Sequence, residues 1–124
     1  MLRDRACREG GWNAGNSIVF GAALAPYIDT TAIALMAFKD GRDPVAVQGL
    51  KWMRQALPNC PSVYSLAWAS IPFSVHRDQA FDPAIIHLSK ALSSSNAIDT
   101  ETLGLAAIAL LVAEGRRNPF DVAV

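Results

Sequence analysis

Three similar apolar segments recur along the chain, and this recurrence constrains the fold more than any other feature of the sequence. The segments span residues 29–37, 60–69 and 99–107. A leucine lies six positions after the first residue of each segment, so that successive leucines are 31 and 39 residues apart; they are Leu35, Leu66 and Leu105. A period of this length is typical of helical hairpins that bury their apolar faces against one another. The chain is therefore expected to contain repeated pairs of helices.

A helix-start signal follows each apolar segment. An Asp or Asn precedes a proline three times, 39 and 36 residues apart, at Asp43-Pro44, Asp82-Pro83 and Asn118-Pro119. The Asp or Asn side chain can accept a hydrogen bond from a free amide of the first turn, and proline at the first helical position gives up an N–H that has no partner there. We therefore expect a single domain with an N-terminal loop of residues 1–28 and hairpin units over residues 29–57, 60–94 and 99–124.

The two helices of each expected pair differ in their apolar pattern. The first helix of the third unit, residues 103–113, carries no charge and is expected to be buried all round. The second helix of the first unit instead has one apolar stripe, formed by Ala46, Leu50, Met53 and Leu57, and polar residues elsewhere. Apolar helices inside and amphipathic helices outside predict an all-α fold, a partial α/α toroid of repeated helical hairpins with about five to six helices.

Helix-breaking residues mark the expected interruptions. Pro72 is expected to end or kink its helix, because proline removes a helical hydrogen bond and crowds the preceding turn. The glycine-rich first 28 residues are expected to be mostly loop, with a short helix around residues 17–24. No segment sustains the alternation of an exposed strand, so we expect no β-structure. A sixth helix is expected to start at Asn118-Pro119.

Composition narrows the classes of partner. Eleven basic residues balance eleven acidic ones, which argues against nucleic acid as a partner. The longest apolar run, residues 103–113, is shorter than the roughly 20 residues that cross a bilayer. Charged residues near the N-terminus leave no signal-peptide core, so a cytoplasmic location is expected. Only 18% of residues are charged, which predicts an apolar surface that meets a partner.

Two segments near the N-terminus carry a family resemblance. Residues 10–16 read Gly-Gly-Trp-Asn-Ala-Gly-Asn, and residues 26–35 read Pro-Tyr-Ile-Asp-Thr-Thr-Ala-Ile-Ala-Leu. This pattern resembles the repeat of squalene and oxidosqualene cyclases, class II diterpene cyclases and protein prenyltransferase β subunits. In those families a glycine-tryptophan turn joins helical hairpins. The glutamine and aspartate that precede the tryptophan in the cyclases are replaced here by Ala6 and Glu9.

Asp29 is the one candidate catalytic residue. The resemblance to the Asp-x-Asp-Asp-Thr-Ala motif of class II cyclases places Asp29 at the central acid, with Tyr27 and Thr30 in place of the flanking acids. A donor that protonates an alkene needs neighbouring carboxyl groups, whereas a lone aspartate at a helix start favours its ionised form. The residues themselves therefore favour a helix cap, and Asp99 stands at the equivalent place in the third unit.

Aromatic side chains are the candidate ligand-binding residues. They are Trp12, Tyr27, Phe38, Tyr64 and Trp68, which could line an apolar cavity, with Phe73 beside them. The alternative is that they pack in the core, and that Trp12 joins neighbouring hairpins. Cys7 and Cys60 follow no metal-ligand spacing and are expected to be buried, and His76 and His87 form no local array with them. We expect no metal and no cofactor.

Two functions follow from these observations. The first is a non-catalytic or remnant toroid-like domain that self-associates or binds an apolar ligand or partner. The second is part of a terpenoid cyclase or prenyltransferase-like enzyme acting on an isoprenoid substrate. In both, a homo-oligomer or another chain is expected to complete the helical ring, because an arc of hairpins exposes faces at its ends.

Overall fold

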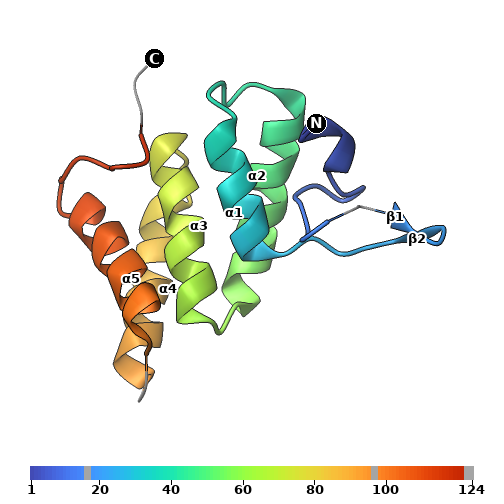
Figure 1. The fold of residues 1–124 in the computed structure, drawn as a ribbon. Helices are drawn as coiled ribbons and strands as arrows, with labels where there is room; N and C mark the ends of the chain where they lie inside the picture. Colours follow the sequence, from blue (N-terminus) through green and yellow to red (C-terminus); the bar gives the residue numbers. More distant parts are fainter. Residues whose placement is uncertain (16–17, 96–97, 122–124) are drawn as a thin grey trace.

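A computed structural model describes residues 1–15, 18–95 and 98–121 of the chain (Figure 1). The fold is all-α, as the apolar pattern predicts. Short 3-10 turns cover Arg3–Arg5 and Leu57–Asn59. The five helices are α1 (Ile28–Ala37), α2 (Pro44–Ala56), α3 (Val63–Val75), α4 (Phe81–Ser94) and α5 (Thr100–Ala113).

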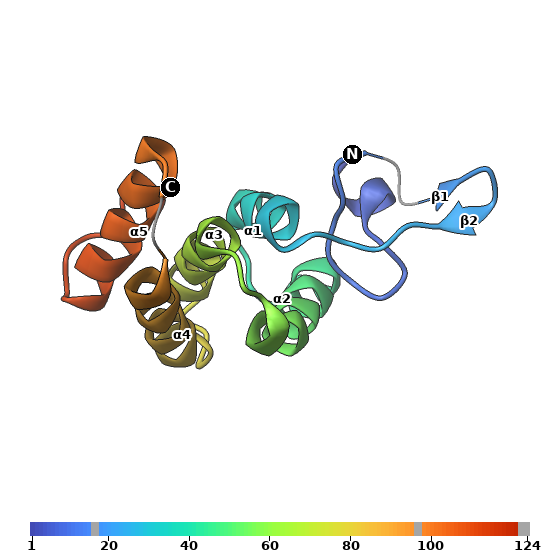
Figure 2. The same ribbon diagram turned by 90° about the horizontal axis from the view of Figure 1, so that it is seen from below.

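Helix α3 lies at the centre of the fold. It contacts α1, α4 and α5, while α2 packs against α1. Figure 2 shows α1, α3 and α5 in one row, with α2 and α4 both on the same side of that row. Five helices pack together in this way, and neither a closed ring nor a structural repeat is evident among the described residues.

The core follows the recurring leucines. Leu35 and Leu66 are fully buried and Leu105 is nearly so, together with Met53 and Phe73. The expectation that the helix at residues 103–113 is buried all round is wrong, because α5 lies at the end of the row and contacts other helices on one side only. Its opposite face exposes Leu103 and Leu111.

Two of the expected helix caps are present. Asp43 caps α2 by accepting a hydrogen bond from the Val45 amide at 3.0 Å, with Pro44 at the first helical position. Asp99 caps α5 by accepting from the Thr102 amide at 2.7 Å. This hydrogen bond is the main reason why the pKa of Asp99 lies below its ordinary value.

The expected caps at Asp29 and Asp82 are wrong, because each helix begins earlier. Helix α1 begins at Ile28, where the Trp12 carbonyl already accepts a hydrogen bond from the Tyr27 amide, so Asp29 lies inside the first turn. Helix α4 begins at Phe81. In the turn just before it, the Asp78 carboxylate accepts a hydrogen bond from the Ala80 amide. Asp82 then lies in the first turn, where a negative charge still favours the helix.

The segment around residues 18–23 corrects two further expectations. It forms a two-stranded antiparallel hairpin of β1 (Ile18–Val19) and β2 (Ala22–Ala23), rather than a helix. Phe20 and Gly21 make its two-residue turn with φ of 50° and 77°, and positive φ at both positions is what the tightest hairpin turns require. Ser17, where the expected helix would begin, lies outside the described residues.

Two further expectations concern proline positions. Pro72 lies inside α3, which continues to Val75, so the proline does not end the helix. The expected sixth helix does not start at Asn118-Pro119, since residues 118–121 contain only a turn in the described chain. There the buried Asn118 side chain accepts a hydrogen bond from the Phe120 amide within the turn. It also donates one to the Ile71 carbonyl, which ties the segment to α3.

Candidate functional site: an apolar hollow beside Trp12

Trp12 joins the N-terminal segment to α1. Its indole is only 3% exposed, and its Nε1–H donates to the Leu2 carbonyl at 2.8 Å. Its backbone amide donates to the buried Thr31 hydroxyl at 2.9 Å, and its carbonyl accepts from the Thr30 hydroxyl at 2.8 Å. These bonds satisfy polar groups that would otherwise be buried without partners.

The chain reaches Trp12 through a tight glycine turn. Gly10 and Gly11 have φ of 100° and 78°, a backbone conformation that favours glycine. A Cβ at Gly11 would lie 2.7 Å from the Thr31 hydroxyl oxygen, so no larger residue fits there without rearrangement. The indole in turn lies so close to α2 that a Cβ at Gly49 would come within 2.9 Å of its ring. Glycine is therefore required on both sides of the indole.

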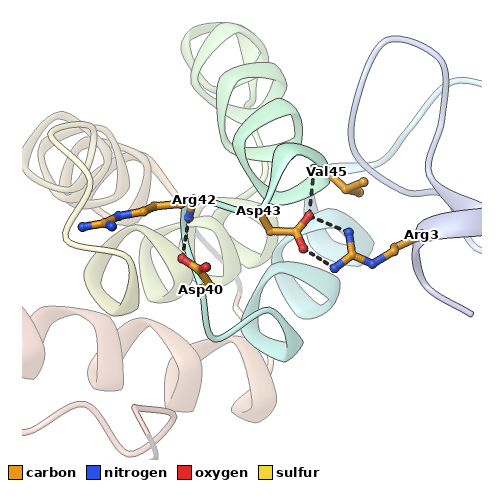
Figure 3. A network of polar contacts seen from close by, with 5 residues as sticks. All are labelled: Arg3, Asp40, Arg42, Asp43 and Val45. Atoms are coloured by element: carbon orange, nitrogen blue, oxygen red, sulfur yellow. Dashed lines mark hydrogen bonds and ion pairs between the residues drawn. The ribbon is translucent and has the colours of Figure 1, made fainter.

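An ion pair holds the N-terminal segment against the start of α2 (Figure 3). The two terminal guanidinium nitrogens of Arg3, Nη1 and Nη2, donate to the Asp43 carboxylate, which also caps α2. The hydrogen bonds from Arg3 are the largest cause of the lowered pKa of Asp43. The Arg3 guanidinium also lies 5.7 Å from the centre of the Phe38 ring, which itself lies 5.5 Å from the Trp12 ring. The segment is thus fixed to both α1 and α2.

A hollow of about 330 Å³ lies between this segment and α1. Its apolar lining includes Leu2, Trp12, Ile33 and Ala34. Arg5, Asn13 and Thr30 contribute polar groups. The Ile33 side chain is 47% exposed, so it lies at the mouth of the hollow, where solvent can reach it. A hollow of this size and lining can take a small apolar group together with one polar end.

Asp29 lies apart from this hollow. It lines a more open groove of about 520 Å³ with Tyr27, Trp52 and Ser65, between the start of α1, the end of α2 and the start of α3. Among the described residues, no second carboxyl group lines the groove. Burial raises the pKa of the nearby Cys60 thiol, and the negative charge of Asp29 adds to the rise.

The candidate aromatic residues lie in three separate places. Trp12 and Phe38 pack together beside the hollow, and Tyr27 is 55% exposed at the Asp29 groove. Tyr64 and Trp68 form an edge-to-face pair on α3, with ring centres 6.4 Å apart. Only Trp12 of these five candidates lines the apolar hollow.

Two contacts in the structure lack a signal in the sequence. Beside the hollow, Arg3 pairs with a carboxylate 40 positions away. Away from the hollow, the ring centres of Phe120 and Trp68 lie 6.0 Å apart. Local patterns do not report such distant contacts. Gly49 did carry a usable signal, because a glycine inside a helix often marks a close approach of another group.

Metal binding receives no support from the described part of the chain. No group of three or more His, Cys, Asp or Glu side chains there could hold a metal ion. His76 instead makes a 2.9 Å hydrogen bond with the Leu35 carbonyl. Cys7 and Cys60 are free thiols and are buried, as expected. Among the described residues, no helix has the length and apolar character needed to span a membrane.

The fold and the hollow define a class: a small all-α protein of five packed helices with an apolar recess under its N-terminal segment. Comparison with known proteins narrows this class no further, since no protein-family model, no curated protein and no solved structure matches the chain.

Proposed function

We propose that this chain is a non-catalytic, remnant α/α-toroid-like domain that acts by binding an apolar ligand or partner. The main support is the apolar surface of α1 and α5, where Ile33, Leu103 and Leu111 are 47%, 50% and 46% exposed. Leaving apolar area of this kind in water costs roughly 25 cal/mol per Å², so a partner that covers it gains that free energy. The glycine-tryptophan turn and the start of α1 supply the resemblance to the toroid families.

The surroundings of Asp29 support the non-catalytic part of the proposal. A carboxyl group that protonates an alkene must be a strong acid held by neighbouring carboxyl groups and hydrogen bonds. The groove at Asp29 is lined by Tyr27, Trp52 and Ser65, which supply no second carboxyl group. The described part of the groove therefore lacks the neighbouring carboxyl groups from which such a proton donor is built.

Farnesol, an uncharged isoprenoid alcohol, is a suitable probe for the hollow beside Trp12. We expect saturable binding in equilibrium dialysis. The affinity should fall by about tenfold or more in Ile33→Glu, because a charge at the edge of the hollow opposes apolar burial. Ile86→Glu is the matched control, since Ile86 is similarly exposed but lies on α4 and does not line the hollow. Equal loss in both variants, or no binding by the unmodified chain, would contradict a site in this hollow.

The alternative function is part of a terpenoid cyclase or prenyltransferase-like enzyme. One observation favours it: Asp29 lies in the first turn of α1 and faces a groove with the aromatic Tyr27. This alternative requires squalene turnover that disappears in Asp29→Asn and persists in Asp4→Asn, a control at an exposed carboxylate. We expect no turnover by the unmodified chain or by either variant, as measured by mass spectrometry of the extracted lipids.

A further inference from the structure

The outward face of α5 is an apolar stripe without a partner in the described chain. Leu103, Ala107 and Leu111 follow one another at intervals of four residues, and all three are exposed. The buried residues of the same helix lie on the opposite side; they are Thr102, Leu105, Ala106 and Ala109. Residues four apart lie on one face of a helix, so the stripe is continuous over about 12 Å.

The two ends of this stripe carry opposite net charges. Asp99 and Glu101 stand at its start. At its other end, Arg116 and Arg117 border a hollow of about 530 Å³ whose apolar lining is Ile108, Leu111, Val112 and Pro119. None of these four charged residues takes part in the ion pairs found among the described residues. The hollow therefore fits an apolar side chain that is accompanied by a negative charge.

We propose that a second copy of this chain occupies the α5 face, with the two α5 helices antiparallel about a twofold axis at Ala107. Leu103 and Leu111 lie at equal distances along the helix on either side of Ala107. An antiparallel pair centred there places the partner's Leu103 opposite Leu111, beside the hollow. The partner's Glu101 then lies within about one helical turn of Arg116. The same contacts are repeated on the other side of the axis, as a twofold interface requires.

A second copy fits this face better than an anionic membrane does. An anionic surface would attract Arg116 and Arg117 but would repel Asp99, Glu101 and Glu114, which border the same stripe. Glu114, Arg116 and Arg117 together leave one positive charge at one end of the stripe, and Asp99 and Glu101 leave two negative charges at the other. A second copy therefore brings unlike net charges together at both ends. Ala107 and Gly104 are exposed on the stripe, and small residues there let two helices approach closely.

Cysteine cross-linking tests this arrangement, which rests on the proposed function for its premise that the exposed apolar faces of α1 and α5 bind partners. We expect Ala107→Cys to form a disulfide-linked dimer under mild oxidation, because the two sulfur atoms meet at the axis. Ala37→Cys is the matched control, an exposed alanine at the end of α1. The native cysteines are buried and are not expected to cross-link. Adding Leu111→Glu to Ala107→Cys should lower the cross-linked fraction about tenfold or more, since it buries a charge at the interface.

Each outcome decides the proposal. Cross-linking of Ala107→Cys no faster than that of Ala37→Cys would overturn it, and so would a rate unaffected by Leu111→Glu in a chain with an unchanged circular dichroism spectrum. Binding of a monomer to phosphatidylserine vesicles through α5 would overturn it in favour of a membrane. Retained farnesol binding without cross-linking would reject the α5 pair alone, whereas loss of both would reject the proposed function as well.

Discussion

Replacing Trp12 by alanine is expected to lower the free energy of unfolding by about 3–5 kcal/mol, as for other buried tryptophans. The indole is buried between α1 and α2, and it packs on Phe38 and against Gly49. Its removal leaves a cavity and leaves the Leu2 carbonyl without the indole N–H. Urea denaturation followed by circular dichroism measures the loss.

Trp12→Phe is the control that separates packing from hydrogen bonding at this position. It keeps an aromatic ring but cannot donate to the Leu2 carbonyl, so we expect a loss smaller than that of the alanine variant. If Trp12 acts only as a ligand contact, Trp12→Ala should weaken farnesol binding and leave stability within about 0.5 kcal/mol of the unmodified chain. That result would contradict the structural role assigned to the indole.

Phe73→Ala is expected to destabilise the fold by a similar amount, about 3–5 kcal/mol. Phe73 is fully buried on α3, the helix that contacts α1, α4 and α5. A cavity there reduces packing among several helices at once, and the rigid backbone around it can fill the space only in part. The unfolding midpoint in urea should fall, while the slope of the transition stays the same.

Phe20→Ala is the matched control for Phe73→Ala. The Phe20 ring is fully exposed, so the same atoms are removed from a side chain that packs against nothing. We expect a change within about 0.5 kcal/mol. Equal losses at the two positions would mean that α3 is not the centre of the core.

Local sequence patterns predicted the helices well where the pattern and the packing coincide. Asp43-Pro44 marks the start of α2 because both cap and proline act within one turn. The recurring leucines identify buried positions because helical periodicity places each of them on the same face as the other buried residues of its helix. These inferences depend only on residues within about one turn of each other.

Patterns failed where distant segments decide the outcome. Helix α1 begins before Asp29 because the carbonyl of Trp12, 17 positions earlier, accepts hydrogen bonds from the Tyr27 amide and the Thr30 hydroxyl. The exposed face of α5 follows from its place at the end of the row, which its uniformly apolar sequence does not reveal. The hairpin of residues 18–23 depends on positive φ at Phe20, an uncommon conformation for a bulky residue.

The candidate site was only partly accessible from sequence. Trp12 could be singled out because the paired glycines before it mark a tight turn. The hollow beside it could not be predicted, since Leu2, Asn13 and Ile33 meet there from two separate segments. The same limit applies to the ion pair of Arg3 with Asp43, which fixes the segment over α1 and α2. Only the tertiary arrangement brings these groups together.

Sedimentation equilibrium of the unmodified chain tests most directly the claim that the exposed apolar face of α5 is a binding surface for a second copy. Between about 1 and 500 µM, we expect a mass that rises reversibly from 13.3 kDa toward twice that value. A mass that stays at 13.3 kDa over the whole range would contradict it.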